Sequence, residues 1–92
     1  MSEIEELKFY IEIYPNFDEY YYRRGIEKYK LEDYQGAIDD FTEAIKRDPY
    51  NEVYYEQRSI VKKQLGNNIG AGKDNKKAER LKYGCWFEKQ KK

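Results

Sequence analysis

The chain has 92 residues and no net charge, with 39% charged and 39% hydrophobic residues. This length fits one small domain with a modest core, and the 17% share of aromatic residues argues against a disordered chain. A single cysteine, Cys85, excludes an internal disulfide framework and a cysteine-rich zinc site, and no apolar run reaches the ~20 residues of a membrane span.

Apolar residues recur at helical spacing along the chain, as in Leu7, Tyr10 and Ile11, and no sustained alternation indicates a strand. Proline disfavours helix in the residue before it, so Pro15 and Pro49, 34 residues apart, should each follow the end of a helix. We expect helices at about residues 3–13, 17–30, 34–47, 52–65 and 69–82, with a short sixth near 85–90.

Polar residues and glycine mark where these helices begin. Asn16, with Glu19 three residues later, is expected to cap the second helix, and Asn51 is expected to cap the fourth. Asp33 and the stretch Gly66-Asn67-Asn68 mark breaks at corresponding places in two helix pairs. Because the connections are short, neighbouring helices should be antiparallel, which predicts an all-α solenoid of helix pairs.

Residues 18–51 resemble one complete tetratricopeptide repeat, whose unit is a 34-residue helix pair. The matching positions are Tyr21, Gly25, Leu31, Tyr34, Ala37, Phe41, Ala44 and Pro49. The small residues allow the paired helices to cross closely. Lys28 and Glu32 depart from the family pattern, which usually has an aromatic residue and a glycine there.

Residues 52–85 resemble a second, degenerate repeat, in which Ser59 takes the small crossing position and Asn75 stands where Phe41 stood. The polar substitutions suit a terminal repeat, and residues 86–92 would form a cap or tail. The segment Cys85-Trp86-Phe87 is expected to fold back over the place that Asn75 leaves open.

Residues 3–15 resemble the second helix of a preceding repeat. Leu7 takes the place of Phe41, while Glu3 and Tyr10 replace the two alanines. The resemblance therefore implies a single domain over residues 1–92 with about two and a half repeats and a superhelical, tetratricopeptide-like arrangement.

No residue pattern favours catalysis. Histidine is absent, and Asp39 and Asp40 are adjacent on a helix, so their carboxylates should diverge on a solvated face. The glycines near residue 70 follow no strand and lack the lysine and hydroxyl residue of a phosphate loop. Cys85 is either a thiol activated by Lys82 or, as we favour, a small core residue. We expect no enzyme, cofactor or metal.

In the family that the chain resembles, the first helix of each pair lines a concave groove that binds a peptide or helix of another protein. The corresponding residues here are Glu19, Tyr22, Arg23, Ile26, Tyr29, Lys30, Val53, Glu56, Gln57, Ile60, Lys63 and Gln64. The alternative for the isoleucines is that they only cover neighbouring helices. Members that clamp a chaperone's terminal carboxylate carry lysine and two asparagines where Tyr22, Ile26 and Gln57 stand, so a clamp is not expected.

Charge is unevenly distributed along the chain. Residues 1–20 carry six acids and one lysine, and residues 73–92 carry eight bases and three acids, balances of −5 and +5. The ends are either solvated, or they attract a second copy head to tail or an acidic partner. RNA binding by the basic segment is the least favoured function, and we expect a soluble, cytoplasmic protein in a reducing compartment.

Overall fold

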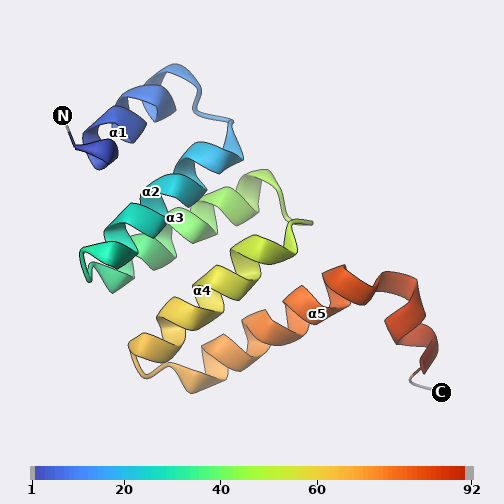
Figure 1. Ribbon diagram of the computed structural model, residues 1–92. Helices are drawn as coiled ribbons and strands as arrows, with labels where there is room; N and C mark the ends of the chain where they lie inside the picture. Colours follow the sequence, from blue (N-terminus) through green and yellow to red (C-terminus); the bar gives the residue numbers. More distant parts are fainter. Residues whose placement is uncertain (1, 91–92) are drawn as a thin grey trace.

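The computed structural model describes the backbone of residues 2–90 and the side chains of residues 2–84. In that range the chain forms five helices and no strand. They are α1 (Glu3–Ile13), α2 (Asp18–Lys30), α3 (Tyr34–Arg47), α4 (Glu52–Gln64) and α5 (Asn68–Gln90). Successive helices are antiparallel and lie side by side from one end of an elongated molecule, 53 × 29 × 14 Å, to the other (Figure 1).

This arrangement confirms the all-α fold of antiparallel helix pairs, and most helix ends lie within one residue of expectation. The exception is α5, whose helical backbone continues to Gln90 across a break at Gly84, where φ is 55° and ψ is −137°. The expected sixth helix is therefore the part of α5 that follows this break. The expected fold-back of Cys85, Trp86 and Phe87 lies outside the described side chains.

Side-chain caps fix the starts of α3 and α4, and the cap at Asn51 is the one expected from sequence. The backbone N–H of Gly36 donates to Asp33 Oδ1 at 3.0 Å, and that of Val53 donates to Asn51 Oδ1 at 3.0 Å. Each cap satisfies a backbone donor that the helix itself leaves unpaired.

The expected cap at Asn16 is wrong. Helix α2 begins at Asp18, with Phe17 at the capping position and no side-chain cap. The preceding turn is held by tertiary contacts instead, because the Pro15 carbonyl accepts hydrogen bonds from the Tyr21 hydroxyl at 2.9 Å and from Arg47 Nε at 2.7 Å. These bonds place the turn so that the helix starts two residues after Asn16.

The core lies between the helices of the complete repeat and α4. Phe41 is fully buried, and a Cβ added to Gly25 would lie 2.7 Å from its ring, so only glycine lets α2 cross α3 this closely. In the second pair Ser59 is buried at the corresponding crossing, where its hydroxyl donates to the Ala71 carbonyl at 3.0 Å. The small positions expected from the family pattern therefore lie where the helices meet.

Asp40 does not lie on a solvated face as expected, because only 2% of its surface is exposed. Arg24 donates two hydrogen bonds to its carboxylate, from Nε to Oδ2 at 2.9 Å and from Nη2 to Oδ1 at 2.8 Å. Lys28 Nζ lies 3.2 Å from Oδ2. The lysine that departs from the family pattern thus supplies the second cation that a buried carboxylate requires.

The same ionic cluster recurs 34 residues later. Arg58 donates from Nε and Nη2 to Asp74 at 2.8 Å each, and Lys62 Nζ lies 3.0 Å from Oδ2 of the same carboxylate. We refer to these two groups, Arg24–Lys28–Asp40 and Arg58–Lys62–Asp74, as ion clusters. They join the first helix of each pair to the second.

Acid should destabilise the second ion cluster. Burial alone would raise the pKa of Asp74, but hydrogen bonds from Arg58 and Lys62 outweigh it and hold that pKa below its ordinary 3.8. The folded state therefore binds this proton less readily than the unfolded state. Its contribution to stability is present above about pH 4 and is lost as the pH falls through the folded-state pKa.

We expect the urea midpoint of unfolding to fall as the pH is lowered below about 4, and Asp74→Asn to have a shallower pH dependence in that range. Hydrogen bonds from Arg47 and Lys46 lower the pKa of Glu43, so part of the slope should remain. An unchanged slope in the Asp74→Asn variant would contradict this assignment.

Candidate functional site

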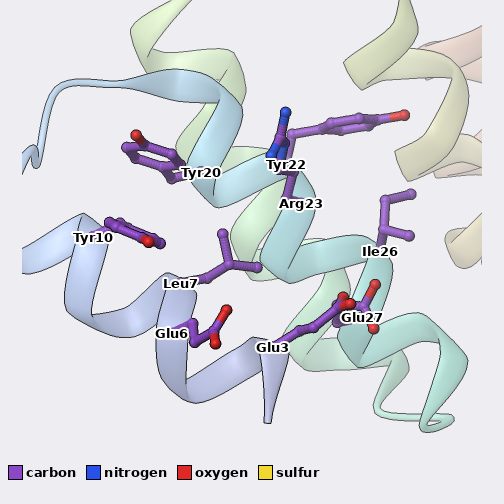
Figure 2. Close-up of a pocket in the computed structure, with 9 residues that line it drawn as sticks. All are labelled: Glu3, Glu6, Leu7, Tyr10, Tyr20, Tyr22, Arg23, Ile26 and Glu27. Carbon is purple, nitrogen blue, oxygen red and sulfur yellow. The ribbon is translucent and has the colours of Figure 1, made fainter. Parts of the chain in front are cut away.

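A groove of about 510 Å³ opens between α1 and α2 (Figure 2). It is lined by Glu3, Glu6, Leu7, Tyr10, Tyr20, Tyr22, Arg23, Ile26 and Glu27. Figure 2 shows Leu7 between the two helices, with Tyr10 and Tyr20 toward one end and the three glutamates toward the other. The groove therefore combines an apolar middle with an aromatic end and an acidic end.

Helical spacing brings these side chains to one place. Glu3, Leu7 and Tyr10 lie four and three residues apart on α1, which puts them on one face of that helix. On α2, Tyr22 and Ile26 are separated by one helical turn. Two antiparallel helices thus contribute one face each to the groove.

The aromatic side chains of the groove are held in place by other rings. Tyr20 stacks on Tyr10 with 5.4 Å between ring centroids and meets Phe17 edge-on at 4.6 Å. Tyr22 lies between Phe41 and Tyr54, at 5.8 and 5.1 Å, and its burial raises its pKa. Because the core fixes Tyr22, this part of the groove is already ordered before any ligand binds.

Tyr54, behind Tyr22, is fixed in turn by a hydrogen bond from its hydroxyl to Asp18 Oδ2. Burial, and then this contact with the Asp18 carboxylate, raise the pKa of Tyr54 well above its ordinary value. The phenol therefore stays neutral and keeps donating its proton, which supports the wall of the groove from inside.

The charges of the groove are only partly neutralised. Arg23 pairs with Glu19 at 3.0 Å, and Lys30 pairs with Glu27 at 3.2 Å. The carboxylates of Glu3 and Glu6 form no ion pair with any side chain that the structure describes. The acidic end therefore attracts cationic groups.

Three of the groove residues expected from sequence, Tyr22, Arg23 and Ile26, line this groove. Tyr29 packs on Tyr34 of α3, with 5.5 Å between ring centroids, at the edge of the core. Glu19 and Lys30 form the surface ion pairs given above. These three residues of α2 do not line the groove.

The expected residues of α4 also lie outside the groove lining. Glu56 lies 3.4 Å from Lys82 of α5, while Ile60 is 45% exposed. Gln57 is half-buried, and Val53, Lys63 and Gln64 are exposed. Their part in binding stays a prediction.

Sequence reasoning missed six of the lining residues, four from α1 and two from α2. These are Glu3, Glu6, Leu7, Tyr10, Tyr20 and Glu27. One signal could have found them. Leu7 takes the place of Phe41, and in the complete repeat α2 covers Phe41. Among the described residues no first helix covers this face of α1, so the face stays open.

The described residues offer little for other chemistry. No group of three or more histidine, cysteine, aspartate or glutamate side chains among them could hold a metal ion. No helix in the described part of the chain is long and apolar enough to cross a membrane.

Comparison with known proteins agrees with the helix-pair fold. A family model described as "Tetratricopeptide repeat" matches residues 19–51, which include α3 and all of α2 except Asp18. The human "Small glutamine-rich tetratricopeptide repeat-containing protein beta" is 43% identical to this chain over 50 residues. The match covers 54% of this chain but only 16% of the human protein. The similarity therefore concerns the repeat region rather than that whole protein.

Proposed function

We propose, because the chain belongs to the tetratricopeptide repeat family, that it is a non-catalytic module that binds a peptide or helix of another protein in the α1–α2 groove. Tetratricopeptide repeats generally mediate binding between proteins, which supports the general role. The site itself rests on one observation, the open groove with an apolar middle, ordered tyrosines and unpaired carboxylates.

The composition of the groove suits a peptide or helix better than a small polar molecule. Leu7 offers apolar contact in its middle, Ile26 adds an apolar side chain to the lining, and tyrosine rings offer large contact area at little entropic cost. Buried aromatic and arginine side chains are the usual energetic anchors of protein interfaces. The other groove residues expected from sequence, among them Tyr29 and Ile60, would extend this surface across α4.

Replacing Tyr10 with alanine should weaken partner capture roughly tenfold, because Tyr10 forms the aromatic end of the groove and truncation of an interface tyrosine can cost about 1 to 2 kcal/mol. The measurement is quantitative mass spectrometry of proteins that the immobilised full chain retains from its native lysate. Tyr50→Ala is the matched control, since Tyr50 is 78% exposed and lies between α3 and α4, away from the groove.

Circular dichroism melting of each variant must first show an intact fold, because Tyr10 also stacks on Tyr20. Equal retention of every captured protein by the Tyr10→Ala, Tyr50→Ala and unmodified chains would reject the groove as the binding site.

Self-assembly is the second candidate function. The acidic groove lies at one end of the stack, and the exposed bases of α5 lie at the other. These bases are Lys73, Lys76, Lys77, Arg80 and Lys82. Head-to-tail association would raise the mass measured by light scattering as concentration rises and salt falls, and a constant monomer mass would reject it.

A further inference from the structure

The two ion clusters follow the 34-residue repeat of the fold. In each, an arginine and a lysine four residues apart on the first helix of a pair bind one carboxylate on the second helix. A small residue, Gly25 or Ser59, directly follows the arginine and lies where the two helices cross. The first helix of each pair therefore carries an arginine, a small residue directly after it, and a lysine four residues after the arginine.

Glu6 is the acidic counterpart of this pattern on α1. It precedes Asp40 by 34 residues, as Asp40 precedes Asp74, and α1 packs against α2 as α3 packs against α4. Its carboxylate is exposed and has no cationic partner among the described side chains. Glu6 therefore has the position of a cluster carboxylate without its arginine and lysine.

The α1–α2 groove also matches the place that α2 itself occupies one repeat later. There α2 packs on Phe41 and Tyr54, through the ring of Tyr22. The residues 34 positions before these two are Leu7 and Tyr20, and both line the groove. The groove is therefore a seat for a helix that would lie on α1 as α2 lies on α3.

Two differences define how much of a helix fits. Tyr10 replaces Ala44 and stacks on Tyr20, so the aromatic end of the seat is already filled. Glu27 replaces the buried Val61, which adds a carboxylate at the opposite end. What remains open faces Glu6 and Leu7, which is enough for about two helical turns with cationic side chains.

We propose that this seat binds an amphipathic helix of a partner protein that carries arginine and lysine four residues apart, with a small residue directly after the arginine. The arginine and lysine meet Glu6, as Arg24 and Lys28 meet Asp40, and the small residue lies over Leu7. The proposal rests on the proposed function and adds the chemistry of the partner. Charge complementarity supports it, since the carboxylates of Glu3 and Glu6 line the seat without a described ion pair, while Glu27 and Arg23 are already paired with Lys30 and Glu19.

The helix would run antiparallel to α1, so its last turn would lie near Glu3. The C-terminal end of a helix carries a partial negative charge, which the Glu3 carboxylate would repel. Basic residues in the last turn of the partner helix would offset this repulsion. The last turns of α2 and α4 are both basic, with Lys28 and Lys30 in one and Lys62 and Lys63 in the other. The same composition is expected of the partner helix.

A synthetic peptide with the sequence of residues 51–66 is a suitable probe, because it contains Arg58, Ser59 and Lys62 in the required spacing. Fluorescence anisotropy with the full chain should show saturable binding. A peptide carrying both Arg58→Ala and Lys62→Ala should bind about tenfold more weakly, because it lacks both cations that would meet Glu6 under the bound helix.

On the protein side, Glu6→Gln should weaken binding of the unmodified peptide by about tenfold. Glu12→Gln is the matched control, because Glu12 is an exposed acid of the same helix that does not line the groove. The Glu12→Gln protein should bind the peptide with unchanged affinity. Salt should weaken the unmodified pair more than the Glu6→Gln pair.

Absence of saturable binding, or equal affinity of both peptides and both protein variants, would overturn the proposed partner chemistry. The groove would then still be tested by the Tyr10→Ala and Tyr50→Ala comparison, so the two failures are distinguishable. If sedimentation shows that the chain associates with itself and that Glu6→Gln abolishes this association, the occupant is a second copy and the partner-helix proposal is wrong.

Discussion

Replacing Phe41 with alanine is expected to lower the free energy of unfolding by about 3 to 5 kcal/mol. The ring is fully buried, lies against Gly25 and contacts Tyr22 at 5.8 Å between ring centroids. Its removal would leave a cavity where α2, α3 and α4 meet, since Ala37 and Val61 belong to the same cluster. A domain of this size has a total stability of about 5 to 14 kcal/mol, so much of it depends on one side chain.

Urea unfolding followed by circular dichroism would measure this loss. Phe9→Ala is the matched control, because Phe9 is 59% exposed on α1 and its truncation should cost well under 1 kcal/mol. Phe41→Leu, which keeps more of the volume, should fall between the two. Equal midpoints for Phe41→Ala and Phe9→Ala would contradict the assignment of Phe41 to the core.

Replacing Asp40 with alanine is the second large effect, at about 2 to 3 kcal/mol. The loss leaves Arg24 and Lys28 without their carboxylate. Their side chains remain 20% and 23% exposed, so water can partly replace the lost partner and the cost stays below that of a fully buried pair. Asp39→Ala, one residue away but exposed, should change stability by less than about 0.5 kcal/mol.

A double variant would separate the lost attraction from the cost of the stranded cations. If uncompensated charge dominates, Arg24→Met added to Asp40→Ala should recover part of the stability, and the two single effects should not add. Equal unfolding free energies for the Asp39→Ala and Asp40→Ala chains would contradict the burial of Asp40 and favour the solvated position expected from sequence.

Helix positions were readable from sequence because short-range chemistry fixes them. Asn51 and Asp33 cap their helices through backbone donors two and three residues away, so these caps depend on local sequence alone. Asn16 looked equally suitable, but its turn is set by bonds from Tyr21 and Arg47 to the Pro15 carbonyl. Arg47 lies 32 residues from Pro15, so this contact depends on tertiary structure.

Burial of Asp40 was hidden for the same reason. Adjacency with Asp39 shows that the two carboxylates diverge, but not which one faces a neighbouring helix. The cations that stabilise Asp40 come from another helix, with Arg24 16 residues away. The recurrence of arginine, lysine and aspartate at the 34-residue interval was the available signal.

The groove expected from sequence runs along the first helices, α2 and α4. Family resemblance indicates which face of a first helix is exposed, and three residues of that face, Tyr22, Arg23 and Ile26, also line the α1–α2 groove. The contribution of α1 depends on which of its neighbours is present, and a sequence pattern does not state that. Sequence reasoning therefore did not assign Glu6 and Leu7 to a groove, although both of them line it (Figure 2).

The row of antiparallel helices has a consequence for how stability is distributed. Each helix makes its extensive contacts with the helices directly before and after it in sequence. Such a stack behaves as a chain of cooperative units coupled to their nearest neighbours, whose ends open more readily than the middle. A helix bound on α1 would convert an end unit into an interior one, so binding would protect backbone amides of α1 from hydrogen exchange and extend that protection into α2.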